Sequence, residues 1–222
     1  MQIDWFPLWL SLRVAALSTV FSLALGLWLA YFLANRNFLG KELLDAFATL
    51  PLVLPPTVLG YYLLVVLGRE SALGRVYEAI FGHPLVFTWQ AAVVAATIHA
   101  FPLLVKTARA ALESVDRVYE KAARNLGASD WRVFWRVTLP LARRSIFAAA
   151  VLAFARSLGD FGATLMVAGN IPHQTQTAAV AIYDAVESGN TMLARVLVLI
   201  ISAGAMLIVY VANRLEHRQV SG

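Results

Sequence analysis

Two charged residues, Arg156 and Asp160, interrupt a long apolar stretch and are the first candidates for chemistry. Their spacing of four places both side chains on one face of a helix. If that helix crosses a membrane, such charges are costly and normally face protein or water in pairs. The two charges can therefore neutralise each other or a neighbouring helix, or Arg156 can lend positive potential to the path of an anion. The nearby Gly159 and Gly162 indicate close helix contact or local bending.

Other reactive groups are too few or too scattered to predict catalysis. The sequence has no cysteine, which excludes disulfides, thiolate metal sites and cysteine nucleophiles. Its four histidines are far apart, and no zinc-protease motif or nucleophile elbow occurs. The pair Gly40–Lys41 lacks the rest of a phosphate-binding loop, since position 35 is Asn35 and Glu42 follows the lysine. We therefore predict no catalytic residue, no metal and no cofactor, and expect any ATP to be used by another chain.

The composition predicts a protein that crosses a membrane several times. Of 222 residues, 60% are hydrophobic and 14% charged, and the mean hydropathy is +0.70. Soluble domains are nearer half apolar and a quarter charged, and disordered chains are more polar still. Because a helix needs roughly 20 apolar residues to cross a bilayer, we expect an all-α polytopic membrane protein with five transmembrane helices. They are predicted at Val14–Ala34, Ala46–Leu67, Leu85–Val105, Ser145–Gly169 and Val196–Asn213.

The basic residues predict how the chain is oriented, and their placement favours topology over nucleic-acid binding. Thirteen of the 18 Lys and Arg residues fall in segments 35–42 and 106–144 and after Asn213. Basic residues accumulate on the cytoplasmic side of membrane proteins. We therefore expect the N-terminus outside, the C-terminus inside, and 106–144 as a cytoplasmic loop within a single transmembrane domain, 1–222. Met1–Trp9 has no Lys or Arg and is predicted to be retained, since a signal peptide starts with positive charge.

Small residues and prolines predict how two of these spans pack and bend. Ser18, Ser22, Gly26, Ala30 and Ala34 recur every four residues, which favours a seam where another helix approaches closely. The second span contains Pro51, Pro55 and Pro56, so its helix must kink or break. Such a break is tolerated in a membrane only against protein or a water-filled cavity. The segment 51–57 either lines a transport pathway or is a fixed bend; His99 and Pro102 are a weaker case, and a lone histidine is more often packed and hydrogen-bonded than a ligand.

The segment 106–144 contains two predicted short amphipathic helices. The first ends at Gly127, a typical C-cap, and Ser129 or Asp130 begins the second, which is expected to end before Pro140. Apolar residues recur at helical spacing in both helices: Val115, Val118, Tyr119, Ala122, Ala123 and Leu126, then Trp131, Phe134, Trp135 and Val137. Such helices either dock into a groove of a partner or lie on lipid head groups.

The string Glu120-x-Ala122-Ala123-x3-Gly127-x9-Val137-x-Leu139-Pro140 resembles the EAA loop of ABC importer permeases, with Val137 where isoleucine is usual. The segments 51–57, 154–164 and 170–172 are similar to those of molybdate permease subunits, with Asp160 where glutamate is usual. The resemblance covers nearly the whole chain. It implies that an ATP-binding subunit is contacted through Glu120, Ala122, Ala123, Leu126, Gly127, Ala128, Leu139 and Pro140.

The resemblance also implies an architecture and a function. The fold would be the MetI-like, type I fold of ABC importer permeases, in the plasma membrane of a bacterium, its inner membrane. The chain would import molybdate by alternating access, as a homodimer with two ATP-binding subunits and an extracytoplasmic molybdate-binding protein. Its translocation pathway would involve Pro51, Pro55, Pro56, Arg156, Ser157, Gly159, Asp160 and Gly162.

Several alternatives remain open beside this interpretation. The substrate could instead be sulfate, thiosulfate or tungstate. A self-sufficient secondary transporter would need internal repeats, and none is visible in the sequence; a membrane enzyme would need clustered polar groups. The outer loop Gln174–Thr191, with a helix predicted over Ala178–Val186, either contacts the binding protein or caps the pore.

Overall fold

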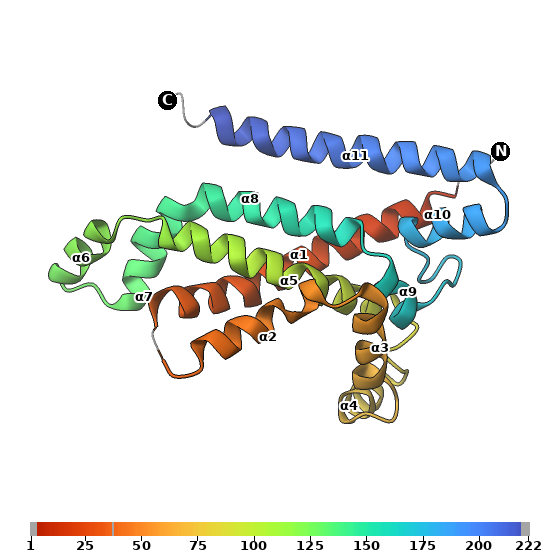
Figure 1. Ribbon diagram of the computed structural model, residues 1–222, viewed down its shortest axis with the longest axis horizontal. Helices are drawn as coiled ribbons and strands as arrows, with labels where there is room; N and C mark the ends of the chain where they lie inside the picture. The colour runs from red at the N-terminus through yellow and green to blue at the C-terminus, as the bar shows by residue number, and fades with distance from the viewer. Residues whose placement is uncertain (1–3, 37, 219–222) are drawn as a thin grey trace.

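The computed structural model describes residues 4–36 and 38–218, in which all regular structure is helical. Four long helices run side by side along the molecule (Figure 1): α1 (Phe6–Asn35), α5 (Trp89–Glu113), α8 (Leu139–Leu158) and α11 (Thr191–Arg218). Each of the four helical stretches that they form is long and apolar enough to cross a membrane, and the bent pair α2 (Lys41–Val53) and α3 (Pro56–Leu67) makes a fifth candidate. With the bent pair counted as one span, the predicted number of five spans is confirmed.

Helices α1 and α5 pack along the predicted seam of small residues. Ser18 and Ser22 are fully buried, and the Ser22 hydroxyl donates to the Thr97 carbonyl at 3.3 Å. A Cβ atom on Gly26 would lie 2.6 Å from Leu104 Cδ2, closer than real Cβ contacts come. The seam therefore does what its spacing predicts: it lets the two helices approach closely.

Replacing Gly26 with valine should weaken this contact, because the new side chain must displace Leu104 and Val105. Overpacking of this kind costs about 1–3 kcal/mol, which we expect as a lower unfolding temperature of the purified protein. Gly204 in α11 is the matched control, since a Cβ there meets no atom within 4 Å. Equal unfolding temperatures for Gly26→Val and Gly204→Val would contradict the seam.

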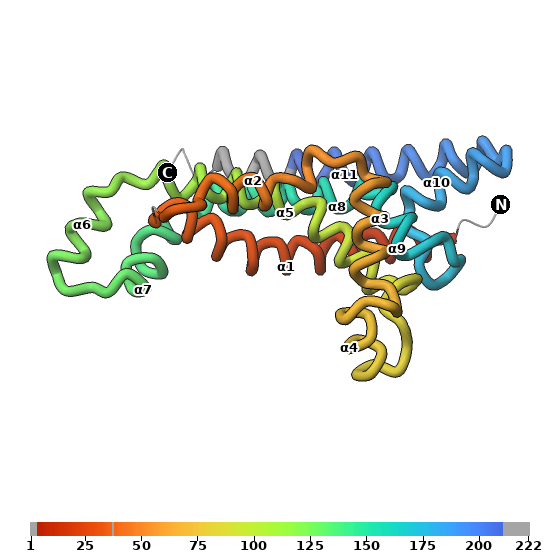
Figure 2. Tube along the Cα trace, turned by 60° about the horizontal axis from the view of Figure 1, so that its bottom comes forward, coloured from red at the N-terminus to blue at the C-terminus, as the bar shows by residue number. Residues whose placement is uncertain are grey.

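The second predicted span is a broken one. The α2 and α3 axes meet at 112°, and the break lies at Leu54 and Pro55, as the prolines predicted. Pro51 lies inside α2, and Pro56 begins α3. Helix α3 continues into α4 (Ala72–Phe81), which the sequence analysis missed; together they form an arm that projects from the bundle (Figure 2).

The fourth predicted span, Ser145–Gly169, is wrong at both ends. Helix α8 stops at Leu158, and a separate helix α9 (Gly162–Ala168) follows. At the other end the helix starts early, through α7 (Asp130–Val133) and a π-helical turn, η1 (Phe134–Thr138). The predicted end before Pro140 is therefore also wrong. The Leu139 N–H bonds to the Phe134 carbonyl, five residues back, and this wide turn accommodates the proline in the first turn of α8.

The remaining connections are short. Since α5 extends to Glu113 and the next continuous helix begins at Asp130, the part of 106–144 outside the long helices is shorter than expected and holds α6 (Arg117–Asn125). Helix α10 (Ala178–Glu187) lies where a short helix was predicted. Its first N–H group, on Ala178, donates to the Ser11 hydroxyl at 2.8 Å, which fastens the loop to α1.

Candidate coupling loop and membrane polar network

Helix α6 ends in a turn at Gly127, as the C-cap glycine in the sequence indicated. Asp116 caps its start by accepting from the Val118 N–H at 2.9 Å. At its end Gly127 has φ +83°, and the N–H of Ala128 donates to the Ala123 carbonyl at 3.1 Å. This left-handed turn satisfies the last carbonyls of the helix and suits glycine, which has no Cβ. A Cβ on Gly127 would meet no atom within 4 Å, so only backbone conformation constrains this position.

Glu120 fastens α6 to the π-helical turn. Its side chain is buried, and it accepts a hydrogen bond from the Thr138 hydroxyl at 2.7 Å. Its second oxygen lies 3.5 Å from Arg124, whose Nε donates to Asp130 at 3.0 Å. The hydrogen bond to Asp130 raises the pKa of Arg124 above its usual range. Residues 116–138, called the loop unit below, are thus tied together across their turn. Thr138 was not predicted, because no motif marks it.

The predicted apolar stripe divides into an outer and an inner part. Val118, Tyr119, Trp131 and Trp135 are exposed, and Leu126 is 90% exposed. Phe134, expected on the same face, is buried instead and packs on Tyr31 of α1 with 4.4 Å between ring centroids. The exposed part is unusually apolar for a surface and lies at one end of the bundle (Figure 1).

The other residues expected to contact a partner lie around this surface. Ala122 and Pro140 are exposed, whereas Ala123, Ala128 and Leu139 are half-buried. The loop unit therefore presents a mixed face of small and large apolar side chains on a rigid support.

A buried polar network joins α5 to the break between α8 and α9. Asp160 is 3% exposed and His99 4% exposed, and His99 Nδ1 lies 2.6 Å from Asp160 Oδ1. The Thr164 hydroxyl donates to the other oxygen of Asp160, and the Arg156 guanidinium contacts His99 Nε2. Because a guanidinium can only donate and it faces Nε2, the hydrogen bond to Asp160 is assigned to the Nδ1–H of His99.

This arrangement corrects the expectation that Arg156 and Asp160 share one helix face. Asp160 follows the end of α8, so the two charges are linked through His99 of α5 and not directly. Arg156 lies two residues before the end of α8. His99 is a packed, hydrogen-bonded residue, as predicted, but its link to both charges was not predicted.

The two helix breaks lie against each other. A Cβ on Gly162 would lie 2.9 Å from Cβ of Pro56, so the α8–α9 break touches the α2–α3 break. Ser157 lies in α8, two residues before Gly159 of the α8–α9 break. It is buried, and its hydroxyl has no hydrogen-bond partner among the described residues. The structure thus brings most predicted pathway residues together at one junction; Pro51 lies apart, inside α2.

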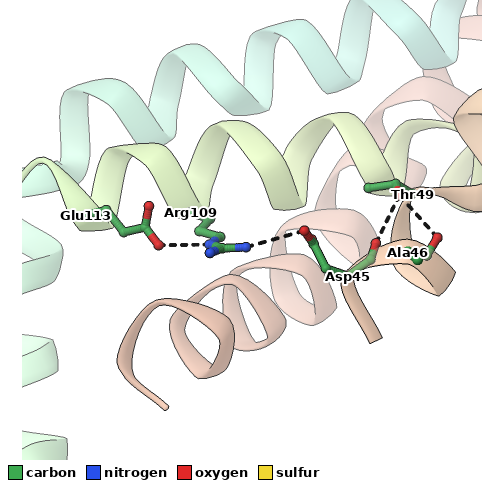
Figure 3. Close-up of polar contacts among 5 residues, drawn as sticks. All are labelled: Asp45, Ala46, Thr49, Arg109 and Glu113. Atoms are coloured by element: carbon green, nitrogen blue, oxygen red, sulfur yellow. Dashed lines mark hydrogen bonds and ion pairs between the residues drawn. The ribbon is translucent and has the colours of Figure 1, made fainter. Parts of the chain in front are cut away.

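A second set of polar contacts holds α2 against α5 and was not predicted (Figure 3). Arg109 donates to Glu113 at 2.8 Å and lies 3.5 Å from Asp45 of α2. The Thr49 hydroxyl donates to the carbonyl of Asp45 at 2.9 Å. Partly exposed pairs of this kind contribute about 0–1 kcal/mol.

Among the described residues, no group of three His, Cys, Asp or Glu side chains could hold a metal ion.

Comparisons with known proteins agree with this architecture. The family model of the "binding-protein-dependent transport system inner membrane component" matches residues 22–221. The molybdenum transport system permease protein ModB of Escherichia coli (strain K12) is 48% identical over 185 residues, which cover 83% of this chain and 81% of that protein.

Two solved transporters share the fold. A chain of a bacterial ABC transporter involved in alginate import superposes with a TM-score of 0.75 at 16% identity, covering 96% of this chain and 78% of that one. A chain of the MetNI methionine ABC transporter, in an inward-facing conformation, gives 0.73 at 18% identity, covering 96% and 94%. The expected type I permease fold is confirmed.

Proposed function

The chain belongs to the family of binding-protein-dependent transport system inner membrane components, and on that basis we propose that it is the membrane subunit of an ATP-driven molybdate importer. The assignment of molybdate as the substrate rests on the high identity with a molybdenum permease over most of both chains. As a transport subunit it is not an enzyme, and ATP hydrolysis takes place on a separate chain.

Molybdate is a dianion, and moving it bare through hydrocarbon would cost far more than binding could return. One copy has too few spans to enclose a polar path, so two copies meet around it. The junction of the two helix breaks supports this proposal, because irregular backbone is tolerated in a membrane only against protein or water. Pro55, Pro56, Ser157, Gly159 and Gly162 would then border the pathway, with Arg156 and Asp160 behind them; Pro51 would contribute only by bending α2.

Alternating access requires a switch between an inward-open and an outward-open state, and a ligand can drive this switch only if it binds one state better than the other. Two ATP-binding subunits supply that bias by closing on ATP, and each seats its cleft on one loop unit. The Glu120–Thr138 hydrogen bond supports this role, because a tied loop moves as one piece and transmits force to α8. The exposed Tyr119, Leu126, Trp131 and Trp135 would fill the cleft.

The orientation follows from the same assignment. The loop unit and its basic residues lie in the cytoplasm, the N-terminus outside and the C-terminus inside. The whole chain, 1–222, is then one transmembrane domain, with the coupling loop of 106–144 inside it. The segment around α10 faces outward, where an extracytoplasmic molybdate-binding protein docks.

The proposal is tested by uptake of labelled molybdate and labelled sulfate at trace concentration, in cells with and without the gene. Deletion should abolish molybdate uptake alone, and wild-type gene should restore it. Depleting the ATP-binding subunit should have the same effect, which a self-sufficient secondary transporter would not show. Loss of sulfate uptake in place of molybdate uptake would refute the substrate while leaving the importer class in place.

A further inference from the structure

A polar cavity of about 340 Å³ lies where four helices meet at the α6 end of the bundle. It is lined by the last residues of α1, by Lys41 at the start of α2, by Glu113 at the end of α5 and by side chains of α6. The transport mechanism proposed above uses the outer surface of α6 and leaves this cavity without a role.

The charges around this cavity favour an anion. Its two carboxylates are already engaged: Glu113 with Arg109, and Glu120 with Thr138 and Arg124. Arg117 and Lys121 also line it, four residues apart on α6. Neither forms a hydrogen bond or ion pair within residues 4–36 and 38–218. Two cations one helical turn apart, without carboxylate partners among the described residues, present a binding site for a phosphate-type group.

A second cavity, of about 470 Å³ and mainly apolar, adjoins the first at Lys41. Its other lining residues include Phe38, Leu39 and Leu43. From there Leu43, Phe47 and Leu50 continue as exposed apolar side chains along α2. A ligand that filled both cavities would carry an anionic group at one end and hydrocarbon at the other.

The depth of this site in the membrane fits a lipid head group. Trp9 and Trp28 of α1 are both 67% exposed, as expected of tryptophans at the two membrane interfaces. They are 19 residues apart (28 minus 9), or about 28 Å along a helix, which matches a hydrocarbon core of about 30 Å. Asn35, beside the polar cavity, lies about 10 Å beyond Trp28, in the head-group layer.

We propose that the two cavities form a binding site for an anionic phospholipid. Its phosphate lies between Arg117 and Lys121, and its acyl chains run from Lys41 along Leu43, Phe47 and Leu50 of α2. Such a lipid would bridge α2 to α6. The proposal does not depend on what the chain transports.

The test is native mass spectrometry of the purified full-length chain, with phosphatidylglycerol or phosphatidylcholine of the same acyl chains. We expect selective retention of phosphatidylglycerol. The double variant Arg117→Gln/Lys121→Gln should bind it about tenfold more weakly or worse, since each cation near a lipid surface adds appreciably to binding. The control, Arg132→Gln/Arg136→Gln, removes the same charge from exposed positions of α7 and η1 and should bind normally.

Two further measurements separate a lipid from a soluble anion and do not depend on how the charge variant folds. On the wild-type protein, millimolar inorganic phosphate or molybdate should not displace phosphatidylglycerol. Phe47→Ser, which keeps every charge, should weaken lipid retention. Equal binding of both lipids, equal loss in the control pair, or displacement by phosphate at low concentration would each overturn the proposal.

Discussion

Replacing Gly127 with valine is expected to lower ATP-driven uptake at least about tenfold while the chain remains folded and inserted. The reason is conformational: Gly127 has φ +83°, where a side chain costs about 1–2 kcal/mol, and a β-branched one more. Since no atom lies within 4 Å of the new Cβ, the expected strain comes from the backbone conformation. The turn is expected to relax to negative φ, which would redirect α7 away from α6 and pull Thr138 from Glu120.

The matched control is Gly82→Val. Gly82 ends α4 with φ +76°, and a Cβ there also meets no atom within 4 Å. The two variants therefore carry the same backbone strain, one inside the loop unit and one outside it. Molybdate uptake, ATP hydrolysis by the assembled transporter and the amount of inserted protein are measured for both. If Gly127→Val transports as well as Gly82→Val, the assigned coupling role of this loop is wrong.

The sequence predicted those parts of the fold that depend on local chemistry. The spacing from Ser18 to Ala34 determines a helix seam, and an alanine-rich run before Gly127 determines a helix end, because the physical requirement lies in the residues themselves. The prolines at 51, 55 and 56 predicted a break for the same reason. The end of α8 at Leu158 was missed, since hydropathy measures how apolar a segment is but not where it bends.

The functional sites show the same difference between residues that a local motif predicts and contacts that depend on the fold. Glu120 was predicted from a motif, but its partner Thr138 was not, since the hydrogen bond depends on how α6 folds back on the π-helical turn. The link of His99 to Asp160 joins residues 61 apart in the sequence, and no periodicity in a single sequence pairs such positions. Asp45 and Arg109, 64 apart, were missed for that reason too.

The second large effect is expected from Asp160→Ala. The substitution leaves the His99 Nδ1–H and the Thr164 hydroxyl without their acceptor and removes the charge that balances Arg156. Breaking a buried charged network in this way costs about 3–5 kcal/mol, so the purified protein should unfold at a clearly lower temperature and be recovered in lower yield. Asp160→Asn, which keeps an acceptor for His99 but not the charge, should fall between Asp160→Ala and wild type.

The control, Asp45→Ala, removes a carboxylate that is 3.5 Å from Arg109 and partly exposed, and should cost no more than about 1 kcal/mol. A second comparison tests whether the charges act together. If Arg156 and Asp160 balance each other through His99, then Arg156→Gln combined with Asp160→Asn should cost less than the sum of the two single variants, because neither charge is left without the other. Additive costs, or an Asp160→Ala protein as stable as Asp45→Ala, would show that the two charges are not coupled, and Arg156 would then be available to an anion in the pathway.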